Sequence, residues 1–447
     1  MIQLSPQVHT VLQRLESAGF EAFLVGGFVR DAIRGVPLNT DWDITTSALP
    51  DQVKSIFSDH RLIETGLQHG TVTVLVDAFP LEITTYRIDE SYSDHRRPDS
   101  VRFTRSLEED LARRDFTMNA LAYHPSTGIV DPFSGQRDLA NRLIRCVGDP
   151  DRRFREDGLR ILRALRFSAT LELEIEAETA AAIHRNKELL HHIAPERVQT
   201  ELTKLLCGPN AGSVLHEYRD VFSVIIPEFA PMFDFEQHNL HHDKDIWFHT
   251  VSVVSAINPT PVLRWSALLH DIGKPPCFSF DENGIGHFYG HAAQSTILAD
   301  AILTRLRFDN AGRERIVRLV RYHDLPISAD IKQIKRLLNK HGVDATRELI
   351  ELHRADTLGL APSYWHRTTI FSQAEAMIVD LLRQDACFSL RDLAIRGTDV
   401  LALGLTGKEV GTALELCLNA VIDEQVPNEV ESLITFLRQS SCFSQKI

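Results

Sequence analysis

A short segment, TDWDITT at residues 40–46, places two acidic side chains two positions apart in a run suited to a β-strand. Side chains alternate along a strand, so Asp41 and Asp43 are expected on one face and Trp42 on the other. Two carboxylates that close repel each other unless a cation lies between them. Mg²⁺ prefers carboxylate oxygens together with substrate phosphates, and Glu82, in the segment LEITTYR, could supply a third carboxylate. The alternative is that the two aspartates bind no metal and are solvated charges at the edge of a sheet, where they oppose aggregation.

The residues just before this pair could hold phosphate. In the segment FLVGGFVRDAIRG, Gly26 and Gly27 stand between an expected strand and an expected helix. Backbone N–H groups and the helix dipole favour phosphate at such a helix start. Arg30, one turn into the helix, could add a charge-assisted contact. The glycine pair followed by the two aspartates therefore predicts a phosphate loop beside a metal site.

A second group of residues could distinguish nucleobases. The segment EDGLRILRALRF carries four polar residues at spacings of three: Asp157, Arg160, Arg163 and Arg166. On a helix, successive members of this series are neighbours. A carboxylate accepts hydrogen bonds and a guanidinium only donates them. Asp157 with Arg160 could thus accept cytosine and adenine, which present an amino donor beside a ring acceptor, and refuse uracil and guanine. The alternative is a solvated helix face with i,i+3 ion pairs.

The segment RRDFTMNA adds further polar residues directly before what the pattern predicts to be an apolar helix. They are Arg113, Arg114 and Asp115, which we include in the second group. The alternative is that Asp115 caps the expected helix while the arginines lie exposed.

These residues need a scaffold of two kinds. Up to about residue 130, short strands alternate with helices: EAFLVGG and TDWDITT are expected strands, FVRDAIRG a helix capped by Gly35, and TVTVLV and LEITTYR a hairpin-like pair. From about residue 140 onwards, helical periodicity continues almost without interruption. The sequence therefore predicts an α+β protein whose N-terminal mixed sheet and helices are followed by an all-α part.

Composition narrows the class of protein. The 447 residues suffice for two to four domains, and the net charge of -13 argues against a general nucleic-acid coat while leaving room for a local basic groove. Six cysteines form no CxxC pair, which is typical of a reduced protein without structural zinc or disulfides. The N-terminal segment lacks the features of a secretory signal, and no apolar run approaches the roughly 20 residues that span a membrane. We therefore expect a cytoplasmic protein with no membrane partner.

Taken in order, seven segments of this chain resemble the class II tRNA nucleotidyltransferases, the CCA-adding family of the polymerase-β superfamily. They are LVGGFVRD, DWDITTS, LEITTYR, RRDFTMNALAY, DPFSGQRDL, EDGLRILRALRF and PERVQTEL, between about residues 20 and 210. The resemblance implies four domains. They are a polymerase-β-like nucleotidyltransferase head at 1–140, a helical neck for nucleotide and RNA at 141–210, a helical body at 211–365 and a helical, tRNA-binding tail at 366–447.

The resemblance also implies roles, matched position by position. Asp41 and Asp43 would bind Mg²⁺, with Glu82 as a third catalytic acid. Gly27, beside Gly26, and Arg30 would contact the triphosphate. The other contacts to ATP and CTP would come from Arg114, Asp115 (near the sugar), Asp157, Arg160, Arg163 and Arg166. The 3′-hydroxyl of tRNA would attack, and pyrophosphate would leave.

The second half carries an ordered series of histidines and aspartates, in WFHTVSVV, ALLHDIGKPP, FYGHAAQS, VRYHD and LHRADTLG. This order resembles an HD-type metal-dependent phosphohydrolase, and imidazole with carboxylate suits a divalent transition metal. The ligands would be His249, His270, Asp271 and Asp356, with Asp324 as the alternative to Asp356. His291 and His323 could complete a second metal site or contact phosphate. The alternative is a remnant domain that only shapes the body.

We therefore expect a CCA tRNA nucleotidyltransferase that adds C, C and A from CTP and ATP without a nucleic-acid template. The segment between Glu82 and the RRD motif resembles the full-length loop of enzymes able to add A. Addition of A alone is an alternative, as is a poly(A) polymerase, although those enzymes usually carry a basic C-terminal extension and this chain ends in QSSCFSQKI. A hydrolase with a nucleotide-sensing head and a non-catalytic RNA-binding scaffold are less favoured, because the acids are intact. The sequence indicates no oligomeric state.

Overall fold

The computed structural model describes residues 2, 4–36, 42–77, 79–89, 101–238 and 243–440. Two compact units, Met1–Ala230 (unit 1) and Pro231–Ile447 (unit 2), make up the chain, and each is described by itself. Asp41, residues 90–100 before the RRD motif and the histidines near residue 241 lie outside the described residues.

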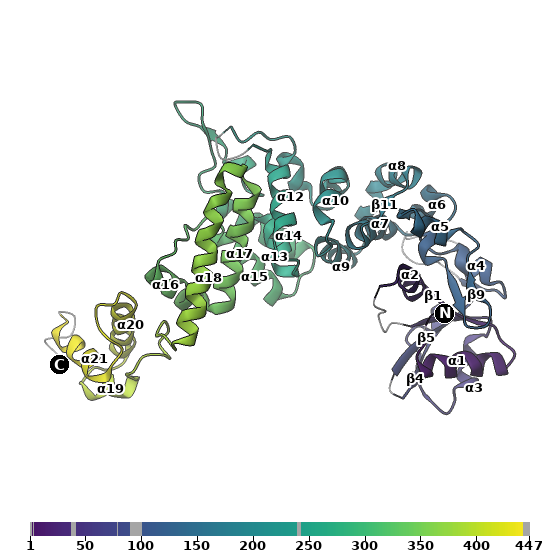
Figure 1. Ribbon diagram of the computed structural model, residues 1–447, viewed down its shortest axis with the longest axis horizontal. Coiled ribbons are helices and arrows are strands. Elements are labelled where there is room, and N and C mark those ends of the chain that lie inside the picture. Colours follow the sequence, from purple (N-terminus) through teal and green to yellow (C-terminus); the bar gives the residue numbers. More distant parts are fainter. Residues whose placement is uncertain are drawn as a thin grey trace. The chain divides into compact units, whose positions relative to one another are not determined.

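A seven-stranded mixed sheet lies in the first part of unit 1, in the order β3-β4-β5-β2-β1-β8-β9 (Figure 1). Strands β2 and β5 run parallel, and the other neighbouring strands run antiparallel. The strands are β1 (Ala22–Val25), β2 (Asp43–Thr46), β3 (Arg61–Ile63), β4 (Thr71–Val76), β5 (Phe79–Thr85), β8 (Ala122–His124) and β9 (Gly128–Val130). A separate two-stranded ribbon joins β6 (Arg87–Asp89) to β7 (Val101–Phe103).

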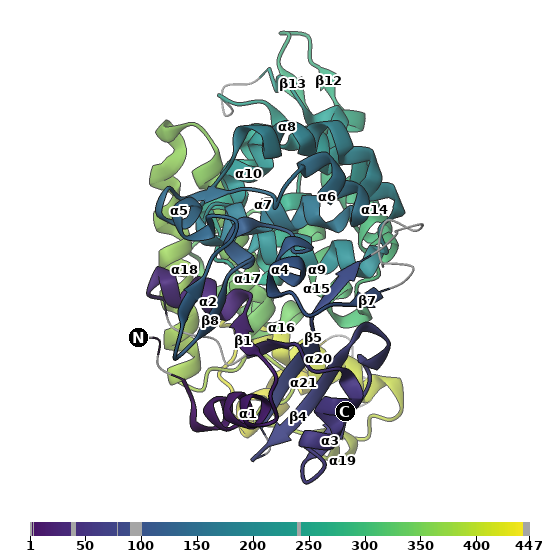
Figure 2. The same ribbon diagram turned by 90° about the vertical axis from the view of Figure 1, so that its right-hand side faces the viewer.

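Along β4, every second side chain is buried, and these buried side chains mark the face of the sheet that packs against the helices. In β4, Val72, Val74 and Val76 are buried and the threonines and Leu75 between them are half-buried. Helices α1 and α3 pack against each other, with α1 also contacting β1 and α3 contacting β4 and β5 (Figure 2). The helices and turns of this part are α1 (Pro6–Ser17), α2 (Gly27–Arg34), α3 (Pro50–Ile56), η1 (Leu67–His69), α4 (Leu107–Ala112), η2 (Thr117–Asn119) and α5 (Gly135–Ala140).

The rest of unit 1 is helical except for a short parallel pair of strands, β10 (Leu143–Ile144) and β11 (Glu174–Ile175). Helix α7 packs against α9 and α10, and α6 packs against α8. The elements are α6 (Pro150–Glu156), α7 (Leu159–Leu171), α8 (Ala177–Asn186), η3 (Lys187–His192), α9 (Pro195–Leu206), α10 (Ala211–Glu217) and α11 (Arg219–Ile225). The turn η4 (Pro227–Met232) includes the last residues of unit 1 and the first of unit 2.

Unit 2 is a set of packed helices with one short hairpin. The long helices α17 and α18 lie side by side (Figure 1), and α12 and α15 also pack on α17. Its first elements are α12 (Ile246–Ala256), α13 (Pro261–Leu269), η5 (Pro275–Cys277), β12 (Ser279–Phe280), β13 (Gly286–His287), α14 (His291–Arg305) and α15 (Asn310–Tyr322). They are followed by α16 (Ile331–His341), α17 (Val343–Gly359), η6 (Pro362–Arg367), α18 (Thr368–Arg383), α19 (Gly397–Ala402), α20 (Lys408–Ile422) and α21 (Val430–Gln439).

The fold class is confirmed, and the strands and helices expected in the first 130 residues are met with two exceptions. Helix α2 ends at Gly35, whose φ of 68° is left-handed, as expected. The strand expected over 40–46 begins only at Asp43 among the described residues. The helix expected after the RRD motif is wrong, because only the 3-10 turn η2 forms there. Thr117 N–H donates to the Arg145 carbonyl, and Val147 N–H donates to the Asp115 carbonyl, so a neighbouring segment takes the backbone hydrogen bonds.

The four-domain division remains a prediction, since the chain separates only into the two units. One core cluster crosses the predicted boundary at 365, because Phe371 and Ile378 of α18 pack with Ile334 of α16 and Ile350 of α17. Among the described helices, none combines the length and apolar character needed to cross a membrane.

Substitution of Gly135 tests how tightly the RRD segment is packed. An added Cβ at Gly135 would lie 2.2 Å from the Thr117 carbonyl oxygen. We expect Gly135→Ala to lower the free energy of unfolding by about 2–3 kcal/mol, because backbone must move to admit the methyl group. Gly411→Ala is the control, since nothing lies within 4 Å of that site in α20, and alanine there should be neutral or stabilise by up to about 1 kcal/mol. Thermal unfolding by circular dichroism measures both, and an unchanged melting temperature for Gly135→Ala would contradict the packing.

Candidate active site

Two of the three predicted acids lie together on the sheet of unit 1. Asp43 begins β2, and its partner across the parallel pair is Glu82 of β5. Neighbouring strands lie about 4.8 Å apart, and registered residues point to the same face. Both side chains are exposed, whereas Ile44 and Ile83, the next residues of the two strands, are buried. The strands therefore present a pair of carboxylates to solvent on a rigid base, while Asp41 lies outside the described residues.

The glycine turn before α2 lies directly against Asp43. Gly26 has a φ of 73°, in the left-handed region. A Cβ at Gly26 would be 3.3 Å from Asp43 Oδ2 and 3.5 Å from a guanidinium nitrogen of Arg114. The residue thus needs both the backbone freedom and the small size of glycine. Helix α2 begins at Gly27, so its first N–H groups lie beside the carboxylates.

Arg30 is buried and held by several partners. Its guanidinium contacts Asp31 through two hydrogen bonds of 2.8 Å and donates to Asn119 Oδ1 at 3.0 Å. It also lies 5.1 Å from the centre of the Phe167 ring. Arg30 therefore joins α2 to η2 and α7, a role that its spacing from the glycines did not reveal.

Asp115 is the buried acid of the RRD motif. It accepts hydrogen bonds from Phe116 N–H and Asn119 Nδ2, and it lies 2.7 Å from Arg163. Burial alone raises the pKa of Asp115, but Arg163 and the bond from Asn119 outweigh it and lower the pKa to about 2. Because no α-helix follows, this carboxylate orients Arg163 rather than capping a helix.

Asp157 does not lie on the helix that carries the three arginines. It precedes α7 in an extended conformation, with φ -142° and ψ 106°. Its carboxylate pairs with Arg197 of α9 at 2.9 Å, and its carbonyl accepts from Arg160 N–H at 3.0 Å. The expectation that Asp157 and Arg160 share a helix face is therefore wrong, although the backbone keeps the two residues adjacent.

The arginines of α7 each have a buried or half-buried partner. Arg160 contacts Glu156 at 2.7 Å and donates to the Arg113 carbonyl at 3.0 Å. Arg166 pairs with the buried Glu201 of α9 at 2.6 Å. The alternative of a solvated helix face is therefore wrong for this segment, because Arg160 is only 9% exposed.

Three guanidinium groups converge on one aromatic ring. Arg30, Arg163 and Arg166 lie 5.1, 5.4 and 3.9 Å from the centre of the Phe167 ring. Cations are attracted to an aromatic face, so Phe167 helps to hold like charges together. Phe167, Arg197 and Glu201 were missed by the motif analysis. Arg197 and Glu201 could have been found, since they stand four apart in PERVQTEL and so share a helix face.

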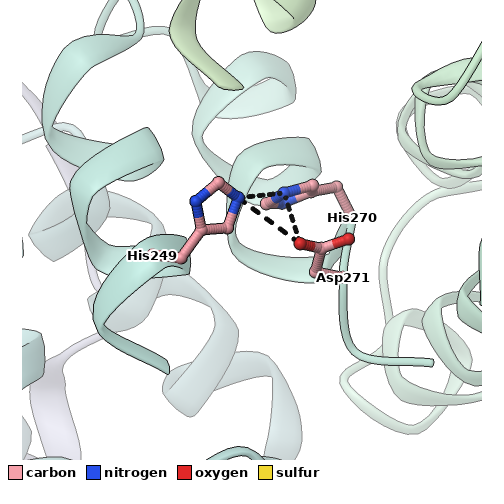
Figure 3. Close-up of side chains that lie close together, drawn as sticks. All are labelled: His249, His270 and Asp271. Carbon is pink, nitrogen blue, oxygen red and sulfur yellow. Dashed lines mark hydrogen bonds and ion pairs between the residues drawn. The ribbon is translucent and has the colours of Figure 1, made fainter. Parts of the chain in front are cut away.

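The histidine and aspartate series of unit 2 also comes together. His249 Nε2 lies 3.4 Å from Asp271 Oδ2, and His270 Nε2 lies 3.2 Å from the same oxygen (Figure 3). His249 Nε2 also lies 3.0 Å from Asp356 Oδ1. His291 and His323 approach the other oxygen of Asp271, each at 3.5 Å. Two groups of potential metal ligands thus share one carboxylate: His249, His270, Asp271 and Asp271, His291, His323. Asp356, rather than Asp324, contacts His249 and His270.

Backbone carbonyls orient three of these imidazoles. The Nδ1 atoms of His270, His291 and His323 lie 2.7, 2.9 and 2.7 Å from the carbonyls of Ala267, Phe288 and Val320. An Nδ1–H that donates to a carbonyl leaves the Nε2 lone pair available to a metal. All three Nε2 atoms point into the cluster, which is the arrangement that ligation requires.

The charges of the cluster favour a cation. Burial raises the pKa of Asp271, but His270 and Lys274 hold it well below its usual value. Burial lowers the pKa of His270, but Asp271 and Asp356 raise it to about 10. The buried carboxylate of Asp271 and the half-buried carboxylate of Asp356 thus draw positive charge toward them. A cavity of about 570 Å³ adjoins them and is also lined by Lys274, Tyr289 and Arg367.

Three family models match separate parts of the chain. The poly A polymerase head domain matches residues 22–145. A model described as "Probable RNA and SrmB- binding site of polymerase A" matches residues 172–233. A model of tRNA nucleotidyltransferase domain 2 matches residues 296–437.

Similar proteins include CCA-adding enzymes. A CCA-adding enzyme of Ligilactobacillus salivarius is 44% identical over 53% of this chain, and the match spans 60% of that relative's length. A CCA-adding enzyme of Levilactobacillus brevis is 34% identical over 95% of both chains. A crystal structure of the Bacillus stearothermophilus CCA-adding enzyme in complex with CTP is 29% identical, covers 99% of this chain and 100% of its own, and superposes with a TM-score of 0.72. Because the match to the Levilactobacillus relative runs the length of both proteins, the chain belongs to the family of CCA-adding enzymes.

Proposed function

We propose that this protein adds C, C and A to the 3′ end of tRNA, using CTP and ATP and releasing pyrophosphate. The observation that carries the proposal is the register of Asp43 with Glu82 beside the glycine turn and Arg114. The match over the length of a CCA-adding enzyme supports it. The solved relative contains CTP, a nucleotide that the proposed reaction uses.

Asp43 and Glu82, together with Asp41, would hold Mg²⁺, because two exposed carboxylates on one sheet face supply the oxygen ligands that this ion prefers. When bound, the ion stabilises the negative charge of the attacking and leaving oxygens. The first N–H groups of α2, with Arg30 and Arg114, would bind the triphosphate. The tRNA 3′-oxygen forms a bond to the α-phosphorus, the bond to pyrophosphate breaks, and the hydroxyl proton passes to solvent.

Selection of the base would come from the neck, without a nucleic-acid template. Asp157 lies at the junction of α6 and α7, where its carboxylate can accept from the amino group of cytosine or adenine. Arg160, Arg163 and Arg166 supply donors, and Asp115, Glu156 and Glu201 hold those donors in place. A fixed pattern of one acceptor and neighbouring donors is complementary to C and A and mismatched to U and G.

Addition is tested with three tRNA transcripts that end before CCA, after the first C, or after CC. Each is incubated with Mg²⁺ and CTP, ATP or both, and the products are sized at single-nucleotide resolution. We expect the first transcript to grow by three nucleotides. Growth of the CC-ended transcript alone would show an A-adding enzyme, continued growth in ATP would show a poly(A) polymerase, and no growth on any transcript would refute the proposal.

Asp43→Asn should abolish catalysis while tRNA binding is retained. We expect the rate of addition to fall at least about 100-fold, because the amide is a poor ligand for Mg²⁺, while tRNA affinity in a filter-binding assay stays within about threefold. Asp51→Asn is the matched control, since this aspartate lies exposed in α3 and pairs only with Lys54 among the described contacts. Retained addition by Asp43→Asn would show that the strand pair does not hold the metal.

We propose a second activity for unit 2, which is hydrolysis of a phosphoester at a divalent transition-metal site. Four imidazoles and two carboxylates are the observation that favours it, since such a ligand set suits these metals. A metal there would activate a water molecule for attack on phosphorus. His249, His270, Asp271 and Asp356 would hold it, and His291 and His323 would hold a second ion or the phosphate.

Metal content tests this site independently of activity. We expect the purified protein to retain at least one transition-metal ion per chain by mass spectrometry, and Asp271→Asn to lose it. Gly359→Ala should also reduce it, because an added Cβ would lie 2.9 Å from His249 Cε1 and displace that ring. His184→Ala is the control, since this exposed histidine pairs with Asp220 in unit 1. Equal metal content in all four proteins would contradict the assignment.

A further inference from the structure

Asp110 is a buried carboxylate that no predicted role uses. It lies in α4, four residues before Arg114, and its side chain is 0% exposed. Thr45 Oγ1 donates to Asp110 Oδ2 at 3.0 Å, and Arg87 N–H donates to Asp110 Oδ1 at 3.3 Å. Arg113 Nε donates to Oδ1 at 2.9 Å, and Arg114 lies 3.8 Å from Oδ2. One carboxylate therefore contacts β2, the start of the β6–β7 ribbon and both arginines of the RRD motif.

Asp110 lies close to β2, the strand that carries Asp43. Thr45 follows Asp43 by two residues in β2, so the two side chains point to the same face. Thr45 therefore lies about 7 Å along the strand from Asp43, and its hydroxyl donates to Asp110. Arg114 spans this interval, with one nitrogen toward Asp110 and another 3.5 Å from the Cβ position of Gly26, which is also next to Asp43.

The charge of Asp110 is retained despite its burial. Burial raises the pKa of Asp110, but Arg113, Arg114 and the hydroxyl of Thr45 outweigh it and hold the pKa below its usual value. A buried ion pair contributes little net stability compared with apolar packing. If position 110 served packing alone, an uncharged residue would thus be sufficient. To orient a guanidinium group, the position needs a carboxylate.

We propose that Asp110 is a positioning residue of the nucleotide site, which holds the Arg114 guanidinium beside Asp43 and Gly26 so that it meets the incoming nucleotide. The inference rests on the proposed function, because it takes Arg114 as a nucleotide contact. Asp110 itself touches no substrate. It holds Arg114 against the strand that carries Asp43, so the distance between the Arg114 guanidinium and the proposed metal ligands stays constant.

Double-mutant kinetics test this inference. The kcat and KM for CTP are measured on the transcript that ends before CCA, for wild type, Asp110→Asn, Arg114→Ala and the double variant. We expect Asp110→Asn to raise KM at least about tenfold with a smaller change in kcat, because a loosened Arg114 weakens nucleotide binding. The double variant should be no worse than Arg114→Ala, since both changes remove one interaction.

Glu108→Gln is the matched control, because it removes the same charge from the exposed face of the same helix; its KM should be unchanged. The inference would be overturned if the losses of the two single variants multiplied in the double variant, or if the KM of Asp110→Asn were unchanged. In either case, addition by the wild type would still support the proposed function. If Asp110→Asn does not fold, Asp110→Glu decides, since it keeps the charge but moves it by one methylene; a raised KM supports the inference and an unchanged KM overturns it. No addition by wild type would refute both the function and the inference.

Discussion

An ionised group taken out of water needs a partner of opposite charge, and the site of unit 1 depends on this constraint. The arginines at positions 30, 160, 163 and 166 each pair with a carboxylate, and three of them, Arg30, Arg163 and Arg166, gather round the ring of Phe167. Asp115 holds Arg163, and Glu201 holds Arg166. The arginines could not lie so close together without these acids and the ring of Phe167.

The same pairing prepares the site for selection. A guanidinium held by two or three contacts loses little further freedom when a nucleotide arrives, so donors and acceptors are already aimed. Asp157 is held in this way by Arg197, and Arg160 by Glu156. In the proposed reaction a base would have to fit this fixed pattern, and a protein without a template strand would in this way distinguish C and A from U and G.

In unit 2, neighbouring groups also hold the side chains of the site in place, but these side chains are histidines and aspartates instead of arginines. Carbonyls from the ends of α13 and α15 fix the tautomers of His270 and His323, and the carboxylate of Asp271 lies between the two histidine groups. Close packing is part of this arrangement, because Gly359 leaves room for the His249 ring and for nothing larger. A metal would neutralise the buried carboxylate of Asp271 and the half-buried carboxylate of Asp356.

Local signals in the sequence predicted the parts of the site that neighbouring residues determine. Strand alternation placed Asp43 correctly, the turn glycines preceded α2, and Gly35 ended it. Errors arose where distant segments decide the outcome. Residues 145–147 take the backbone hydrogen bonds of the RRD segment, which prevents a helix. Asp157 pairs with Arg197, forty positions away, and no spacing rule for one helix could reveal this. Asp110, in helix α4, was missed because its partner Thr45 lies on strand β2, 65 positions away in the sequence.

The most direct measurement of the central claim is the choice of nucleotide when all four are offered. The transcript that ends before CCA is extended in an equal mixture of the four triphosphates, and the added bases are sequenced for wild type, Asp157→Asn and the control Asp151→Asn. Wild type and control should add C, C and A. Asp157→Asn replaces an acceptor with an amide that can also donate, so incorporation of U or G should rise about tenfold or more, as expected for loss of one discriminating hydrogen-bond pair. Unchanged selectivity in Asp157→Asn would contradict the claim that the protein's own acceptors and donors act as the template.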